Sequence, residues 1–352
     1  MRYRFAVVGC GGMEGAHEEA FARLRDRVHV VATADPIRER AEQAAEALGA
    51  EVAVTDYRDV IEDVDAALIV VPHHLHHPIG MDFIRRGKHV LIEKPLAVSE
   101  QECLELIHAA SSEDVLLMVA YPLRYHPLVV AMKNELDAGR IGEVFQIAIW
   151  TEQLTQWPKG DWHSSRETLG GGQLFSHGCH YVDLLLWMLG DPIEGAHFGC
   201  RKGTPWMEGE GTSNITIKFA SGALGYHFGT WGARGTKHGY EFQAHGSDGM
   251  LALNLATSTL MLHKGNSADL IHEHRGSTKY VEGELSHFVA CLDGKASPLT
   301  DGPSSLQGLR VIWRLYRAEN EGRIADLSGL GLHAEWEQAG LDLLPPARRR
   351  QG

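Results

Sequence analysis

A glutamate, a lysine and a proline, Glu93-Lys94-Pro95, stand directly after a short apolar run. Residues 90–92 are apolar and predict a buried parallel strand. Open α/β sheets bind ligands just outside the carboxyl ends of their strands, so these charged groups are expected at the mouth of a crevice. A lysine beside a glutamate can there exchange a proton with a bound hydroxyl. A surface salt bridge at a strand end is the alternative that this stretch alone leaves open.

Two histidines and an aspartate lie three residues apart in the middle of the chain. His177, His180 and Asp183 follow the glycine triplet 170–172 and enter an apolar run that predicts a buried helix. This spacing places all three near one face of the first turns. A lone histidine on an apolar helix is usually a satisfied core residue. At the start of a buried helix, after a glycine-rich loop, it is a candidate for acid–base chemistry.

Aromatic and polar side chains precede the glycine triplet. Trp157, Asp161, Trp162 and His163 supply the ring faces and hydrogen-bonding groups that a sugar-sized ligand needs. An ordered loop that plugs the cleft is the alternative interpretation. Arg124 is a candidate by position alone. The predicted substrate contacts are Lys94, Arg124, Trp162, His163, Ser176, His180 and Asp183.

The N-terminal residues carry a glycine-rich turn between a strand and a helix. Residues 5–8 predict a short strand, Gly9 allows the tight turn, and Gly11 lets a pyrophosphate approach the backbone at the start of the next helix. A second strand, 28–34, ends at Asp35, where a carboxylate can accept both hydroxyls of a ribose. The order of glycines, helix, strand and acid predicts a dinucleotide site.

Two positions bear on the choice and affinity of the cofactor. Asp35 favours NAD because it repels a 2′-phosphate, while Arg38 keeps NADP possible. Glu14 stands where the third glycine of the motif is expected, and a carboxylate there would repel a pyrophosphate. The predicted cofactor contacts are Gly9, Gly11, Gly12, Met13, Asp35, Arg38, Pro72, His73, His76, Glu93 and Lys94.

Histidine clusters raise the question of a metal site. His73, His74, His76 and His77 lie on a predicted strand-to-helix loop, where neighbouring imidazoles cannot all converge on one ion, and no cysteine or carboxylate accompanies them. We expect one or two to face the nicotinamide end of the cleft. The segment 272–274 likewise lacks further ligands and is expected to be exposed. No metal site is predicted.

The order of predicted elements divides the chain into two domains and a tail. Strands and helices alternate up to residue 120, among them a strand over 66–71 and a helix over 79–86, which predicts a doubly wound parallel sheet of the Rossmann type in an α/β fold. From about 193 to 264 apolar and polar residues alternate between glycine-rich turns, which predicts a large, open, mostly antiparallel sheet in an α+β domain. The predicted units are a cofactor domain at 1–120, a substrate and oligomerisation domain at 121–330, and a partly flexible extension at 331–352.

Composition narrows the class of partner. The 352 residues carry a net charge of −13, which argues against nucleic acid or an anionic membrane. No segment is apolar for long enough to span a bilayer, and the N-terminus has no secretory pattern, so we expect a cytoplasmic protein. The open face of the second sheet predicts a homodimer or homotetramer.

Together these residues resemble the Gfo/Idh/MocA family, which includes glucose–fructose oxidoreductase and inositol dehydrogenase. The resemblance extends to about residue 327 and is carried by the segments 9–13, 93–95, 170–183 and 299–302. It implies a Rossmann domain, an open-sheet domain, an active site between them, and NAD or NADP as cofactor. It also implies catalytic roles for Lys94 and His180. Many members carry an aspartate four residues before that histidine, where this chain has Ser176.

The function predicted from these residues and this resemblance is an NAD(P)-dependent oxidoreductase that transfers a hydride from a sugar or cyclitol hydroxyl. His180 takes the hydroxyl proton while Lys94 orients the oxygen. Ser176 and Glu14 motivate one alternative, a cofactor-binding sensor without catalysis, and an NAD-assisted glycoside hydrolase is a further alternative.

Overall fold

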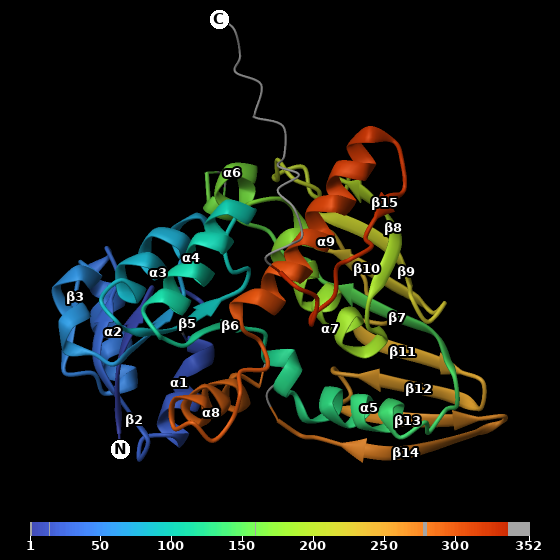
Figure 1. Ribbon diagram of the computed structural model, residues 1–352, viewed down its shortest axis with the longest axis horizontal. Helices are drawn as coiled ribbons and strands as arrows, with labels where there is room; N and C mark the ends of the chain where they lie inside the picture. The colour runs from blue at the N-terminus through green and yellow to red at the C-terminus, as the bar shows by residue number, and fades with distance from the viewer. Residues whose placement is uncertain (1, 14, 159, 277–279, 337–352) are drawn as a thin grey trace, which may run out of the picture.

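The computed structural model describes residues 2–13, 15–158, 160–276 and 280–336. The predictions for Glu14, and for the tail beyond residue 336, fall outside the described residues. Two sheets, side by side, form the body of the molecule (Figure 1).

The first sheet has six strands in the order β3-β2-β1-β4-β5-β6, and each neighbouring pair is parallel. This order confirms the predicted Rossmann fold. The strands are β1 (Tyr3–Val8), β2 (Val28–Ala34), β3 (Val52–Val54), β4 (Ala66–Ile69), β5 (His89–Glu93) and β6 (Leu117–Ala120). The connecting helices are α1 (Gly15–Arg23), α2 (Arg38–Leu48), α3 (His76–Ile84) and α4 (Glu100–Ser112).

Helices cover both faces of this sheet, so its central strands are apolar at successive positions. In β1, Ala6 and Val8 join the core that includes α3 and α4, whereas Phe5 and Val7 join the core beneath α1. A strand buried on both faces has no solvent-facing side, which explains the continuous apolar run in place of an alternating one.

The predicted bounds of two elements need correction. We expected a helix over 79–86, but α3 begins at His76, after the 3₁₀ turn η2 (His73–Leu75). The reason is that a proline is tolerated in the first turn of a helix, and Pro78 stands there. The strand expected over 66–71 ends at Ile69. The segment of clustered histidines is therefore mostly helical rather than a loop.

The second sheet has nine strands in the order β14-β13-β12-β11-β7-β10-β9-β8-β15. All of its pairings are antiparallel except that of β7 with β10, so the predicted large, mostly antiparallel sheet is confirmed. The strands are β7 (Val144–Glu152), β8 (Pro192–Cys200), β9 (Thr212–Phe219), β10 (Leu224–Thr230), β11 (Tyr240–Gly246), β12 (Gly249–Asn254), β13 (Thr259–Lys264), β14 (Ser267–Glu273) and β15 (Ala325–Asp326).

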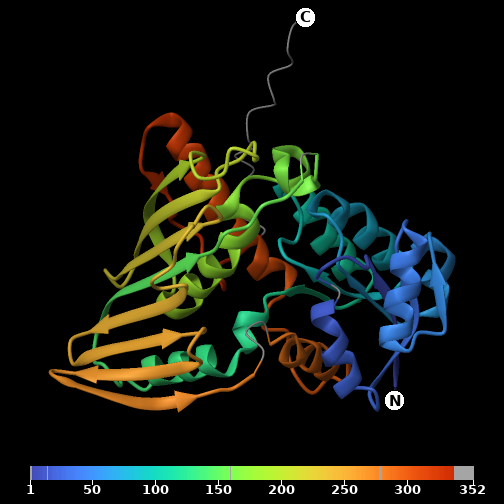
Figure 2. The same cartoon turned by 180° about the vertical axis from the view of Figure 1, so that it is seen from behind.

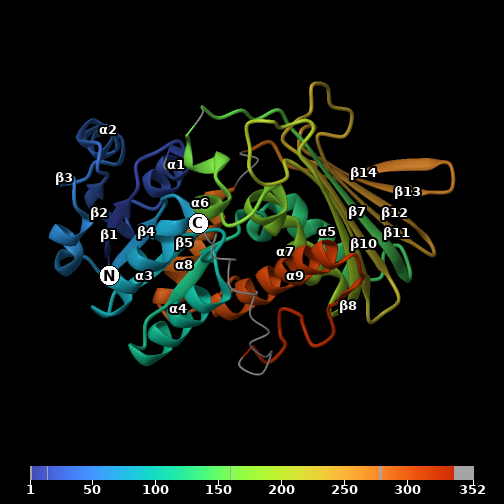
Figure 3. The same ribbon diagram turned by 90° about the horizontal axis from the view of Figure 1, so that it is seen from above.

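Helices pack against one face of this sheet, as the view from above shows (Figure 3). They are α5 (Pro127–Asp137), α7 (Cys179–Leu189) and α9 (Gly302–Glu321). A short helix, α6 (Arg166–Leu169), lies between α5 and α7 in the chain. The strands alternate accordingly: β9 is buried at Ile215, Ile217 and Phe219, with half-buried or exposed residues between them. This is the pattern of a sheet with one apolar face.

Helix α8 (Val281–Leu292) returns to the first sheet and lies beside α1 (Figures 1 and 2). The ring of Phe288 lies 6.0 Å from that of Phe5, which in turn lies 5.7 Å from Phe21. Residues that we assigned by sequence to the second domain therefore complete the core of the first.

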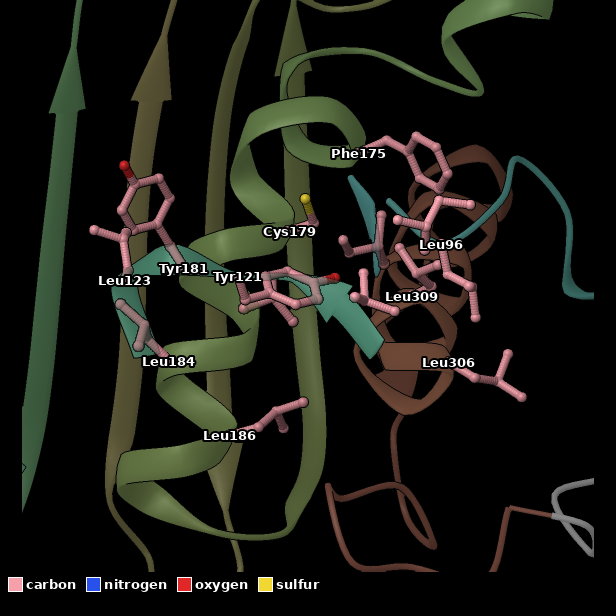
Figure 4. Packing of buried hydrophobic residues seen from close by; sticks show 14 of the residues in the cluster. Leu96, Tyr121, Leu123, Phe175, Cys179, Tyr181, Leu184, Leu186, Leu306 and Leu309 are labelled. Atoms are coloured by element: carbon pink, nitrogen blue, oxygen red, sulfur yellow. The ribbon is translucent and has the colours of Figure 1, made fainter. Parts of the chain in front are cut away.

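The segment that follows β6 joins the two domains. Tyr121 lies between α7, which carries Cys179, and α9, which carries Leu309 (Figure 4). On the other side of β6, the amide of Val119 donates to the carbonyl oxygen of Thr300 at 2.8 Å, just before α9. Contacts on both sides of one strand thus fix how the domains sit relative to each other.

Within the described ranges, no helix is both long and apolar enough to cross a membrane. The same ranges hold no group of three or more His, Cys, Asp or Glu side chains arranged to bind a metal ion.

Candidate active site

The glycine-rich turn between β1 and α1 has the shape that a pyrophosphate requires. Gly9 has a φ of +92°, and a Cβ there would lie 2.2 Å from the carbonyl oxygen of Val70, so only glycine fits. A Cβ on Gly11 or Gly12 would meet nothing within 4 Å, so the backbone of the turn faces open space. Both observations match the predicted roles of these glycines.

Asp35 stands at the end of β2, next to this turn. The amide of Cys10 donates to its Oδ2 atom and the amide of Ile37 to its Oδ1 atom, each at 2.9 Å. Arg38 is the exposed first residue of α2 and pairs with Glu42 at 3.8 Å. The turn and the acid therefore lie where a Rossmann fold holds the adenosine half of NAD, and the residues fit that cofactor.

At the carboxyl end of β5, Glu93 is buried against a histidine that the sequence did not single out. The Nε2 atom of His17, on α1, lies 3.2 Å from Oε1 of Glu93, and both side chains are buried. Burial opposes ionisation of Glu93, but the hydrogen bond from His17 and the nearby Lys94 outweigh it and hold the pKa of this carboxyl below its ordinary value. Glu93 is therefore a carboxylate at neutral pH.

Lys94 reaches from β5 to the second domain. Its Nζ atom donates to the carbonyl oxygen of Ser176 at 3.0 Å. Ser176 belongs to the π-helical turn η5 (Leu174–Gly178), which leads into α7. The bond is to the main chain of Ser176, so it does not depend on the serine side chain.

The glycine triplet before this turn is needed for close packing. A Cβ on Gly172 would lie 2.4 Å from the carbonyl oxygen of Glu210. The carboxyl group of Glu210 in turn accepts a hydrogen bond from Tyr316 at 2.6 Å and one from the amide of Leu174 at 3.2 Å. Because Gly172 has no side chain, the start of η5 packs directly against Glu210.

Residues of both domains line a cavity of about 400 Å³. Met13, Glu93 and Lys94 line it from the Rossmann domain, and His180 lines it from α7. The edge of the Tyr121 ring packs against His180, with centroids 5.6 Å apart. Lys94 and His180, which are far apart in sequence, therefore meet in one pocket of the size that a small ligand needs.

Other polar side chains line the cavity, and only His177 among them was named from the sequence. His177 lines it from η5, Tyr181 from α7 and Tyr240 from β11, while Gln153, just after β7, accepts a hydrogen bond from the Tyr240 hydroxyl. Only His177 had a signal in the sequence, its spacing from His180. Tyr240 and Gln153 meet because β11 pairs with β7, a long-range contact with no local signature.

Asp183 and Arg124 are not among the residues that line this cavity, so their roles as substrate contacts stay predictions. Arg124 Nε lies 3.9 Å from Asp183 Oδ2, and both side chains are almost fully buried. The guanidinium also lies 4.3 Å from the ring centroid of Trp187. Burial raises the pKa of Asp183, and Arg124 partly offsets this. The pair holds α7 to the segment after β6.

Trp162 and His163 pack against His73 of the Rossmann domain and so connect the two domains. These three residues are not among those that line the cavity. The ring of Trp162 lies 3.7 Å from that of His163 and 4.8 Å from that of His73. His73, which follows Pro72, is buried, and its Nδ1 atom lies 2.8 Å from the carbonyl oxygen of Leu169. Burial, with the neighbouring His76 and Lys94, holds the pKa of His73 well below its ordinary value.

His76 contacts the main chain through both of its ring nitrogens. It is fully buried, with one ring nitrogen 2.7 Å from the carbonyl oxygen of Pro95 and the other 2.9 Å from that of Val71. Both nitrogens face main-chain carbonyl groups, and a contact of His76 with the cofactor stays a prediction. His77 pairs with Glu105 at 2.7 Å on the helical surface.

Comparison with known proteins identifies the family. Residues 3–121 match the oxidoreductase family with an NAD-binding Rossmann fold, and residues 129–252 match the GFO/IDH/MocA C-terminal domain. The chain belongs to the Gfo/Idh/MocA family. It is thus an oxidoreductase with an NAD-binding domain, as the resemblance predicted.

Three members of the Gfo/Idh/MocA family illustrate the similarity. Scyllo-inositol 2-dehydrogenase (NAD(+)) of Bacillus subtilis is 28% identical over 85% of this chain and 89% of its own length. Levoglucosan dehydrogenase of Pseudarthrobacter phenanthrenivorans is 27% identical over 70% of this chain and 72% of its own. An NAD-binding oxidoreductase structure from Klebsiella pneumoniae is 25% identical, with a TM-score of 0.82, over 93% of this chain and 99% of its own.

Proposed function

We propose that this protein is an NAD-dependent dehydrogenase that oxidises a secondary hydroxyl of a sugar or cyclitol. The observation that carries the proposal is that Lys94 and His180 line one cavity together with Met13 of the glycine-rich turn. A dinucleotide bound on that turn extends towards this cavity, where a proton acceptor and a cation are available to a hydroxyl.

His180 takes the hydroxyl proton, because an imidazole gains and loses a proton near neutral pH. Lys94 donates a hydrogen bond to the same oxygen and stabilises the negative charge that develops on it. The carboxylate of Glu93 balances the charge of Lys94, and Ser176 positions the ammonium through its carbonyl group. When bound, NAD supplies the hydride acceptor at C4 of its nicotinamide ring.

Two observations support a neutral polyol as the substrate. The polar side chains that face the cavity, Tyr181, Tyr240 and Gln153 among them, can donate or accept hydrogen bonds to hydroxyl groups. The relatives named for scyllo-inositol and levoglucosan act on compounds of this class. The substrate is therefore a ring compound with several hydroxyls.

The preference for NAD over NADP rests on Asp35. Its carboxylate is held by two main-chain amides beside the glycine-rich turn, and a 2′-phosphate at the same place would be repelled. Arg38 is exposed and pairs with Glu42, which leaves its charge partly neutralised.

Two measurements test the proposal. A thermal-shift titration compares NAD with NADP, and absorbance at the reduced-nicotinamide band then follows a panel of inositols and anhydro, aldose and ketose sugars. We expect larger stabilisation by NAD and reduction with at least one polyol. Tight NAD binding without reduction by any compound would favour the sensor instead. Release of a free sugar from a glycoside without net NADH would indicate the NAD-assisted hydrolase.

A further inference from the structure

The cavity contains a second imidazole that the proposed mechanism does not use. The rings of His177 and His180 both line it, with centroids 6.1 Å apart and planes at 83°. His180 is 9% exposed, whereas His177 is only half-buried. Of the two rings, His177 is therefore the one that exchanges protons with water more readily.

The π-helical turn explains why position 177 reaches the cavity. Ser176 is buried, and its carbonyl oxygen accepts the hydrogen bond from Lys94, while the next residue lines the cavity. Such turns place one more residue in the helical cycle than an α-helix does, and they recur at functional sites. At Ser176, where the resemblance leads one to expect a carboxylate, this chain has no ionisable group, but it has one at His177.

We propose that His177 is a proton carrier that receives the substrate's proton from His180 and passes it to solvent. The proposal rests on the proposed function. In the oxidation, the C–H bond breaks and its electron pair leaves with the hydride for the nicotinamide. The O–H bond breaks and its electron pair forms the C=O bond. The released proton moves to His180, then to His177, then to water, so atoms and charge balance.

Neighbouring groups orient the His177 ring. Gln173 Nε2 lies 3.4 Å from its Nδ1 atom, and the Tyr181 hydroxyl lies 3.5 Å from its Nε2 atom. The Tyr240 ring packs edge-on against it at 5.9 Å. These contacts set the direction of the ring.

The other titratable groups that face His177 keep one protonation state near neutral pH. His177 and His180 are therefore the groups whose charge can change there. Burial raises the pKa of Tyr240 to about 12 and that of Tyr181 well above its ordinary value, so both phenols stay neutral. Glu93 and Lys94, across the cavity, carry opposite charges. With ring centroids 6.1 Å apart, a proton on His177 disfavours a proton on His180 by like-charge repulsion.

A titration of the apo protein tests this coupling without any substrate. Histidine carbons at the Cε1 position are followed by NMR as pH changes, in the wild type and in His177→Gln. We expect the titration midpoint of His180 to rise when His177 is removed. His29→Gln is the matched control, since His29 is half-buried and pairs with Glu51 away from the cavity. An unchanged His180 midpoint in His177→Gln would overturn the proposal.

Kinetics test the proton transfer itself. In His177→Gln and His177→Asn we expect NADH to form in the first turnover at close to the wild-type rate. Release of the proton to an indicator dye and steady-state turnover should both slow, on the order of 10²-fold. Added imidazole should restore turnover in His177→Ala, and thermal melting verifies that each variant is folded.

The outcomes separate the two proposals. Wild-type turnover with a polyol, together with unchanged kcat and pH profile in His177→Gln, would overturn the role of His177 alone. A wild type that reduces NAD with no polyol would overturn the proposed function.

Discussion

The ammonium of Lys94 lies 3.0 Å from the carbonyl oxygen of Ser176, and this hydrogen bond connects the two domains at the candidate active site. Lys94 follows β5 of the Rossmann sheet, and Ser176 belongs to the turn that carries His177 and leads to His180. A group from each domain is therefore needed to complete the site, and a shift between the domains would separate the lysine from the imidazoles.

Replacing Lys94 by alanine should lower turnover on the order of 10²-fold, because a donor to the developing oxyanion is lost. Cofactor affinity should change little, which NAD-dependent fluorescence titration measures. Lys88→Ala is the matched control, since Lys88 precedes the opposite end of β5 and its Nζ atom faces the carbonyl oxygen of Glu62 at 3.4 Å. Wild-type turnover in Lys94→Ala would remove this residue from the mechanism.

Replacing His17 by alanine should destabilise the fold by about 1–3 kcal/mol at neutral pH, because a buried carboxylate loses its donor. The pKa of Glu93 is below 4.5 in the folded protein, so its contribution to stability is present above that pH and is lost as pH falls through the lowered value. The difference in unfolding free energy between wild type and variant should therefore become smaller in acid. Urea unfolding at pH 7 and near pH 4 measures it.

The control for His17 is His29→Gln, which alters a partly exposed imidazole that pairs with Glu51. This substitution should lower the free energy of unfolding by well under 1 kcal/mol, which is typical of the loss of a surface ion pair. Equal losses in the two variants would contradict the special role of the His17–Glu93 pair.

Replacing Asp35 by asparagine should weaken NAD binding by about tenfold while reducing the penalty against NADP, since the charge that repels a 2′-phosphate is gone. Asparagine still offers an oxygen to one of the two amides that hold Asp35. Calorimetric titration with NAD and with NADP gives the ratio of the two dissociation constants. Glu39→Gln, an exposed acid on the first turn of α2, is the control and should leave the ratio unchanged.

The uncovered face of the second sheet should form the contact of a homo-oligomer. Trp150 lies there with its ring stacked on His238 at 4.9 Å and edge-on to Tyr226 at 6.1 Å, and Leu224 on the neighbouring strand is 42% exposed. We expect Trp150→Glu to shift the mass measured by light scattering towards one chain. Val52→Glu, on the edge strand of the other sheet, should not. A monomeric wild type would contradict this prediction.

Local patterns in the sequence predicted the parts of the site that one segment determines by itself. The turn at Gly9, the acid at Asp35 and the strand-end position of Lys94 each follow from a short run of residues with a known steric or electrostatic requirement. The order and type of most strands and helices were predictable for the same reason.

The rest depends on contacts between distant segments. Gln153 and Tyr240 meet only once β7 and β11 pair, and His17 reaches Glu93 only once α1 packs on the sheet. Helical spacing placed Asp183 near the face of His180 but could not show that it lies 3.9 Å from the buried Arg124. The π-helical turn has no pattern in the sequence that we could identify.

The return of α8 to the first sheet has a consequence for how the chain is made. Once residues 1–120 have left the ribosome, all six parallel strands are available. The apolar surface of Phe5 that faces Phe288 nevertheless stays uncovered until Phe288 has emerged as well. A fragment cut after residue 120 should therefore aggregate. A circular permutant that begins before α8 and joins the old termini would supply this cover first.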